Sequence, residues 1–245
     1  MMEAPRRATV RGPTFIRSLA RLTAADLPQP TRSLSDQLSL WIDWTHAVAL
    51  STALDGKPPV AVLDERTLTR IDEDECVRVR NALAQAIAGD RAFGARSSGA
   101  GLSGAEQAFA EESLDYPFYR QRYLAMQQGI EAGVGRLRER LRARLALRND
   151  GLERLAAVDT VMERALSRRE RTLWSAGPVL LGQHFERLRQ AAADAQASGD
   201  TSAAASDFWL EAFRNDMHKV LLAELDVRLQ PAQGLLAALC TSPHG

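Results

Sequence analysis

Apolar residues recur at steps of three and four along most of the chain, the spacing that places them on one face of an amphipathic helix. No convincing alternation with a period of two, the pattern of a half-buried strand, is found in the sequence. The stripes predict helices over residues 14–27, 34–54, 64–88, 116–148, 152–175, 178–190 and 207–230, with a short apolar turn at 235–239. The predicted fold class is therefore all-α.

The predicted helix at 34–54 carries apolar side chains on two sides. Trp41 belongs to one stripe. The opposite stripe contains Leu40, Trp44, Ala47 and Leu54. Because a helix that is apolar all round is normally buried, we expect neighbouring segments to cover this helix on more than one face.

Composition and turn residues suggest how the predicted helices are grouped. A Gly- and Ser-rich stretch separates two helical regions, and Asn149-Asp150-Gly151 is a tight turn that makes the two long helices beside it antiparallel. The predicted organisation is a disordered N-terminus at 1–12, an N-terminal helical subdomain at 13–88, a flexible linker at 89–113 and a C-terminal helical bundle at 114–240 with a loose loop at 191–205. The bundle is expected to contain a long coiled-coil-like hairpin.

Overall charge and cysteine content restrict the function classes. The 31 basic residues balance 31 acidic ones, so the net charge of the chain gives no argument for nucleic acid or acidic lipid as the main partner, and charge has to be considered locally. Cys76 and Cys240 lie far apart in the sequence and in no CxxC motif, which predicts buried free thiols in a reducing compartment. No run of 18 apolar residues occurs, so we expect a cytoplasmic protein without a membrane span.

Catalytic motifs are scarce. On a continuous helix, Ser39, Asp43 and His46 would share one face, and they are the residue types of a hydrolase triad. Asp43 and His46 alone could form part of a metal site. One helical row gives poor triad geometry, however, and no second metal motif accompanies it. We expect a hydrogen-bonded polar strip there, with a hydrolase or metal enzyme as the alternative, and predict no catalytic, cofactor-binding or metal-ligating residue.

Residues 136–148 contain six arginines and only one glutamate. Two interpretations remain open. The guanidinium groups of Arg138, Arg140 and Arg142 could bind the phosphates of nucleic acid or anionic lipid. Alternatively, the row pairs with acids of the returning helix. Those acids are Glu153, Asp159, Glu163 and Glu170.

The densest aromatic cluster, at 116–123, has two interpretations as well. Its rings either pack in the core or present an exposed anchor to a partner protein, because tyrosine and arginine are favoured at interface hot spots. The candidate partner-binding residues are Arg138, Arg140, Arg142, Tyr116, Tyr119 and Tyr123.

Several segments resemble a proteobacterial family known as domain of unknown function 3348. They are TFIRSLARL, LSLWIDWTHAVALSTAL, FYRQRYLAMQQGIEAGVGRLRERLRARLA, LERLAAVDTVMERALSRRERTLW and FRNDMHKVLLAELDVRLQPAQGLLAAL, between Thr14 and Leu239. The most specific likeness is LAELDVRLQP followed by GLLAAL, which we interpret as a helix stopped by Pro231. The resemblance implies helical structure and bacterial origin, and it carries no catalytic residues. It also implies gene neighbours that encode a proton channel and an OmpA-like protein, hence an accessory role in an envelope assembly.

These observations favour a non-enzymatic helical interaction or scaffold protein that binds a partner protein. Long amphipathic helices can pair within one chain or between chains, so a homo-oligomer stays open. No cofactor is predicted.

Overall fold

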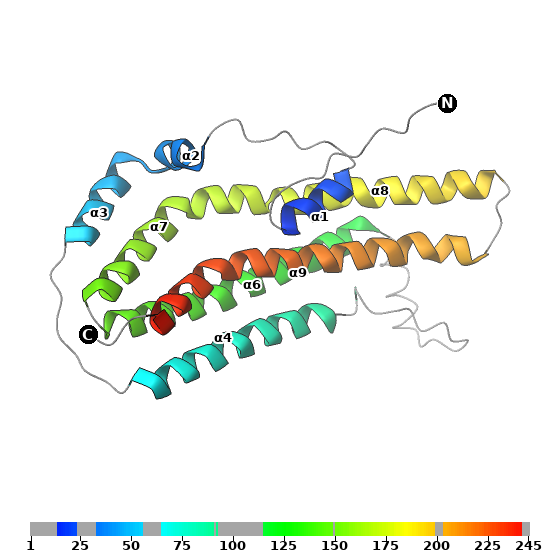
Figure 1. Ribbon diagram of the computed structural model, residues 1–245. Coiled ribbons are helices and arrows are strands. Elements are labelled where there is room, and N and C mark those ends of the chain that lie inside the picture. The colour runs from blue at the N-terminus through cyan, green and yellow to red at the C-terminus, as the bar shows by residue number, and fades with distance from the viewer. Residues whose placement is uncertain are drawn as a thin grey trace, which may run out of the picture. The chain divides into compact units, whose positions relative to one another are not determined.

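The computed structural model of the protein describes residues 14–23, 33–55, 65–90, 92, 115–148, 150–198 and 203–241. Every regular element in these ranges is a helix, and they contain no strand, so the all-α prediction is confirmed. Figure 1 traces the helices in chain order. The predicted disordered N-terminus at 1–12 and nearly all of the predicted linker at 89–113 lie outside the described residues.

The helices follow the predicted apolar stripes closely. They are α1 (Thr14–Thr23), α2 (Leu34–Trp41), α3 (Trp44–Asp55), α4 (Glu65–Ala88), α6 (Tyr116–Ala146), α7 (Asp150–Trp174), α8 (Ala176–Ala197) and α9 (Ala203–Thr241). Pro117 and Pro178 lie in the first turns of α6 and α8, where a missing backbone N–H costs nothing.

Contacts divide the chain into two compact units that differ from the predicted domains. Unit 1 comprises Met1–Gln29, Ile87–Met126 and Ala176–Val227, and unit 2 comprises Pro30–Ala86, Gln127–Ser175 and Arg228–Gly245. The predicted subdomain at 13–88 is split between them, because α1 packs against α8 whereas α2 and α3 pack against α7. Long helices make this division possible, since α6 and α9 each contribute residues to both units.

Aromatic rings fill the core of unit 1. Phe185 of α8 and Phe213 of α9 meet edge to face with their ring centroids 4.9 Å apart, and Tyr119 of α6 lies 5.1 Å from Phe213. All three side chains are fully buried. Each such ring pair contributes about 0.5–1.5 kcal/mol beyond the burial of its apolar area.

Two glycines of α8 allow tyrosines of α6 to approach its backbone. A Cβ atom at Gly177 would lie 2.9 Å from Tyr123 Oη, and one at Gly182 would lie 2.8 Å from a ring carbon of Tyr116. A larger residue at either position would therefore push the tyrosine ring away.

An apolar stripe of α6 forms the core of unit 2. Its buried members are Ile130, Val134, Leu137, Leu141 and Leu145. Close approach of α4 to this helix depends on Gly133, where a Cβ atom would lie 3.1 Å from Leu83. The part of α6 in this unit runs antiparallel to α7, because Gln127 contacts the carbonyl oxygen of Trp174 whereas Arg138, farther along α6, meets Asp159.

The predicted end of the last helix at Pro231 is wrong, because α9 continues through this proline to Thr241. An interior proline costs roughly 3 kcal/mol. Beyond it, however, Leu235 and Leu239 are buried in unit 2. Two buried leucines contribute about 3–6 kcal/mol, which is enough to offset the proline.

The loose loop predicted at 191–205 is helical at both ends. Helix α8 continues to Ala197, and α9 begins at Ala203. Alanine has the highest intrinsic helix propensity, so an alanine-rich stretch without large apolar groups can still prolong a helix.

Candidate interaction surface

The predicted single helix at 34–54 is two helices. Ser33 Oγ caps α2 by accepting a hydrogen bond from the Asp36 N–H at 3.1 Å. After Trp41, Ile42 has an extended backbone, and Asp43 Oδ1 then accepts a hydrogen bond from the His46 N–H at 2.9 Å. Asp43 is thus the N-cap of α3, a position that aspartate strongly favours.

This break separates the predicted polar strip. Ser39 donates its hydroxyl hydrogen to the Ser35 carbonyl oxygen at 2.9 Å, within α2. His46 Nδ1 lies 2.8 Å from the same Asp43 oxygen that caps α3. The capping hydrogen bond is the main cause that lowers the pKa of Asp43 below its usual value. The expectation that Ser39, Asp43 and His46 share one helical face is therefore wrong, and capping accounts for the close pair that remains.

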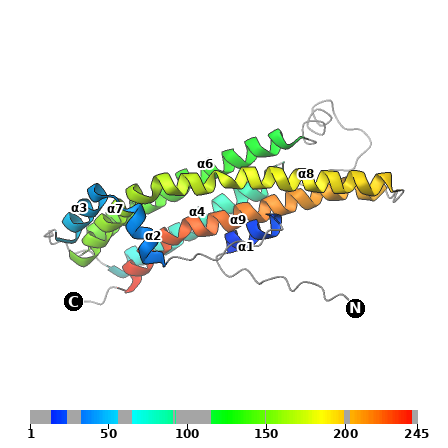
Figure 2. The same cartoon turned by 90° about the horizontal axis from the view of Figure 1, so that it is seen from above.

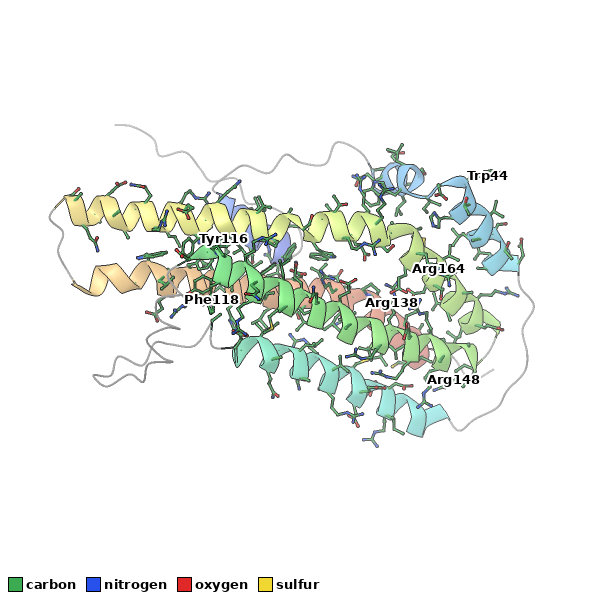
Figure 3. All side chains as sticks on the ribbon, turned by 180° about the vertical axis from the view of Figure 1, so that it is seen from behind. Trp44, Tyr116, Phe118, Arg138, Arg148 and Arg164 are labelled. Carbon is green, nitrogen blue, oxygen red and sulfur yellow. The ribbon has the colours of Figure 1, made fainter. Side chains whose placement is uncertain are left out.

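Helix α3 leaves an apolar surface exposed. We define the α3 face as Trp44, Ala47, Val48 and Leu54, whose spacing places them within one sector of the helix. Trp44 (labelled in Figure 3) is 82% exposed, Leu54 54% and Val48 48%. All twelve residues of α3 are described, and none of them is buried. The expectation that neighbouring segments cover both sides of this helix is thus wrong: α3 packs on α7, beside which it lies in Figures 1 and 2, and its α3 face is open.

The end of α2 also carries an exposed apolar residue. Leu40 is 65% exposed there, while the neighbouring Trp41 lies under an arginine, with the guanidinium of Arg169 4.9 Å from its ring centroid. This cation–π contact joins α2 to α7. It places a positive charge next to Trp41, the residue that follows the exposed Leu40.

Helix α7 carries further exposed arginines. We define the α7 basic row as Arg164, Arg168 and Arg171, which lie at steps of four and three and are all exposed. Together with Arg169 they make four arginines within residues 164–171, a segment whose only acid is Glu170. None of the three has an aspartate or glutamate three or four residues away, the distance at which side chains of one helix pair. That absence is the sequence signal that could have singled out this row.

Four arginines of α6, at positions 138, 140, 142 and 144, are instead paired with acids. Arg138, which is almost fully buried, forms a fork with Asp159, with Nε–Oδ2 at 2.8 Å and Nη2–Oδ1 at 2.7 Å. Arg142 Nη2 lies 2.6 Å from Glu163 Oε2. The interpretation that the row pairs with acids of the returning helix is confirmed for these two arginines. Burial works against the charge of Arg138, but the hydrogen bonds and charges of its acidic neighbours outweigh it and raise the pKa of the guanidinium.

Arg140 turns to a different helix. Its Nε lies 2.5 Å from Glu75 Oε1 of α4, and Arg144 Nε lies 3.6 Å from Asp72 Oδ1. Alternate arginines of α6 therefore connect it to α7 on one side and to α4 on the other, and Figure 3 shows Arg138 on α6 between them. All three candidate partner-binding arginines thus have acidic partners within unit 2.

The three candidate tyrosines belong to the core of unit 1. Tyr119 and Tyr123 are fully buried. Tyr119 Oη accepts a hydrogen bond from Arg214 Nε at 2.8 Å, and Tyr123 Oη donates one to the buried Glu224 at 2.7 Å. The interpretation of core packing is confirmed for these two rings.

Tyr116 is part-buried and tied to α8. Its hydroxyl donates to the carbonyl oxygen of Pro178. Burial raises the pKa of Tyr116 to about 12, so this hydroxyl keeps its proton at neutral pH. Phe118, which Figure 3 labels next to it, stacks edge to face with Tyr119 at 5.2 Å.

One pair of polar side chains escapes sequence reasoning. His184 Nε2 of α8 lies 3.0 Å from Asp216 Oδ2 of α9. On its own helix, His184 has its nearest acid two positions away, and Asp216 has its nearest histidine two positions away. Residues two apart on a helix point in different directions, so neither can form such a pair locally. Only the packing of α8 on α9 brings the two together.

The described ranges contain neither a membrane-spanning helix nor a cluster of metal-ligating side chains. No helix there has the length and apolar character needed to span a bilayer. In the same part of the chain, no three His, Cys, Asp or Glu side chains group as metal ligands.

Comparison with known proteins identifies the family. The family model described as "Protein of unknown function (DUF3348)" matches residues 1–241. The chain belongs to this family. The matched region includes all the helices described above, so the buried pairs, the α3 face and the α7 basic row all lie within the part that defines the family. No curated protein and no solved structure gives a significant match.

Proposed function

We propose that the protein is a non-enzymatic helical interaction or scaffold protein that binds a partner protein through the α3 face. The observation that carries this proposal is the exposure of Trp44, at 82%, on a helix without a single buried residue. Contiguous exposed apolar side chains on a folded domain mark interaction sites. Tryptophan and arginine are also the residues most enriched where binding energy concentrates.

The surface specifies the chemistry of the partner. Apolar anchors at spacings of three and four fit a second helix or a groove lined with apolar residues. The α7 basic row lies on the helix against which α3 packs, so a partner that reaches both elements gains from acidic side chains. We therefore propose a partner segment with apolar anchors flanked by aspartate or glutamate.

The use of polar groups elsewhere supports a structural role. Arg138, Tyr123 and Arg214 bear functional groups found in many active sites, yet each hydrogen-bonds to another helix of its own unit. These bonds hold helices in register. We infer that the bundle serves to present surfaces.

The test compares Trp44→Ser with a matched control, Phe208→Ser, which changes an exposed aromatic residue of α9 that is outside the α3 face and is 70% exposed. Both variants and the parent chain are purified from the native cell, and the associated proteins are quantified by mass spectrometry. We expect Trp44→Ser to lose a partner that Phe208→Ser retains. Equal recovery of every associated protein with both variants would overturn the proposal.

The first partners to test follow from the family resemblance. We propose components of an envelope or proton-channel-linked assembly. Substituting Arg164, Arg168 and Arg171 by glutamine then separates a protein partner from the alternative of nucleic acid or anionic lipid. If the partner is protein, the triple variant weakens its capture, and the parent chain does not bind vesicles of phosphatidylglycerol. Salt-dependent binding to such vesicles would instead support the alternative.

A further inference from the structure

The two cysteines, far apart in the sequence, meet in unit 2. Cys240 lies in the last turn of α9, and its Sγ donates a hydrogen bond to Glu73 Oε1 of α4 at 3.4 Å. Cys76 follows Glu73 by three residues on the same helix. Side chains three residues apart on a helix have Cβ atoms about 5–6 Å apart. The Cys240 thiol therefore lies within one helical turn of Cys76 on α4, close enough for the two thiols to interact electrostatically.

Acidic surroundings keep both thiols protonated. Burial, together with smaller contributions from Glu75, Asp72 and Cys240, raises the pKa of Cys76 to about 11. Burial and Glu73 likewise raise the pKa of Cys240. Because the thiolate is the reactive form, the pair reacts slowly at neutral pH. Both cysteines are free in the structure, Cys76 half-buried and Cys240 exposed.

We propose that Cys76 and Cys240 form an intrachain disulfide when the protein meets a disulfide oxidant such as glutathione disulfide. This modification site joins α4 to the last turn of α9. Exposure makes Cys240 the first thiol to react and leaves Cys76 as the resolving thiol.

The reaction proceeds in two balanced exchanges. Cys240 loses its proton to solvent, and its sulfur attacks glutathione disulfide. The S–S bond of the oxidant breaks, and one glutathione leaves as a thiolate that takes up a proton. Cys76 then loses its proton, attacks Cys240 Sγ in the mixed disulfide, and expels the second glutathione. Two protein thiols are oxidised, and one glutathione disulfide is reduced to two glutathione molecules.

The test incubates the full chain with glutathione disulfide at about pH 8.5, where more of each thiol is ionised. Intact mass and peptide mapping follow the product. We expect a monomer lighter by two hydrogen atoms, with a cross-linked peptide pair that contains Cys76 and Cys240. Dithiothreitol should reverse this product, and Cys76→Ala should stop the reaction at a glutathione adduct on Cys240. If the parent chain itself stops at that adduct, or forms only disulfides between chains, the proposal is overturned.

The rate supplies a second readout that does not depend on a cysteine variant. Below the pKa of the attacking thiol, the rate should rise about tenfold per pH unit. Glu73→Gln removes the carboxylate beside Cys240 and should accelerate the first exchange. Glu131→Gln, a change of an exposed glutamate elsewhere in unit 2, is the matched control and should leave the rate unchanged. Equal rates for Glu73→Gln and Glu131→Gln would contradict the assigned role of Glu73.

Discussion

Two arginine-rich helical segments of unit 2 use their guanidinium groups in opposite ways. In α6, Arg138 and Arg142 are paired with Asp159 and Glu163 of α7. In α7 itself, the basic row at 164–171 is exposed. The α6 segment has the higher net charge in the sequence, yet its arginines are paired with acids that belong to neighbouring helices. Net charge along a segment therefore does not show which arginines stay exposed and unpaired with acids of other helices, whereas the position of acids on the packed neighbours does.

The largest expected difference between the two regions concerns stability. Arg138→Ala leaves Asp159 without its main partner in a part-buried site, and breaking such a pair costs about 3–5 kcal/mol in the free energy of unfolding. Arg168→Ala, on the exposed row, should change it by less than about 0.5 kcal/mol. Urea unfolding followed by circular dichroism measures both.

A double variant keeps this prediction falsifiable. Arg138→Met combined with Asp159→Leu replaces the ion pair by apolar groups and should recover most of the lost stability. Equal effects of Arg138→Ala and Arg168→Ala would show that the α6 pairs contribute no more than exposed charges do.

The buried tyrosines should be next in sensitivity. Tyr123→Phe removes a hydrogen-bond donor from Glu224, which is fully buried, and should cost about 1–3 kcal/mol. Trp44→Phe, on the α3 face, should stay within about 0.5 kcal/mol. Thermal and urea unfolding of the two variants compare a core residue with a surface residue. A neutral Tyr123→Phe would mean that Glu224 does not need this hydroxyl.

Asp72 should make unit 2 less stable as the pH rises. Its side chain is buried, and burial raises its pKa despite the charge of Arg144. The folded form therefore favours the protonated acid, and its contribution is lost as the pH rises from the unfolded pKa through the folded one. Asp72→Asn should gain melting temperature relative to the parent chain as the pH rises above about 3.9, the ordinary pKa of aspartate. A difference in melting temperature between the two chains that shrinks as the pH rises would contradict this explanation.

Asp43 should show the opposite dependence with a smaller effect, because it is exposed. Capping of α3 lowers its pKa, so its contribution is present above the unfolded pKa and is lost as the pH falls through the folded one. Asp43→Ala should therefore lower the melting temperature at neutral pH and lose that effect in acid. Asp43→Asn, which retains a capping side chain, should have a weaker effect at neutral pH. Identical results for the two variants would indicate that the cap is unimportant.

Helical periodicity was sufficient to predict most of the helices and the core of α6. It failed to predict helix boundaries at positions where the preference of a single residue competes with the pattern around it or with burial in the tertiary structure. Asp43 lies in the middle of the predicted helix at 34–54 but caps a new helix, and Pro231 lies inside α9 because the leucines beyond it are buried. Spacing along one helix cannot weigh these competing contributions.

Side-chain pairs between helices and the exposure of the apolar stripe could be identified only from the tertiary structure. The pairing of His184 with Asp216 and the approach of Cys240 to α4 depend on helix packing, which no local pattern encodes. The stripe of Leu40, Trp44 and Leu54 is visible in the sequence, but the usual burial of apolar residues predicts that it belongs to the core. An interaction surface has the same pattern as a core, and only its exposure distinguishes them.

Site-specific photocrosslinking tests the central claim most directly. A photoreactive phenylalanine analogue replaces Trp44 in one chain and Phe208 in another, and both are irradiated in the native cell. We predict a defined protein crosslink from position 44 that weakens when Arg164, Arg168 and Arg171 are changed to glutamine, with no such product from position 208. The absence of a crosslink from position 44, or the same product from both positions, would contradict the proposal that the α3 face binds a partner.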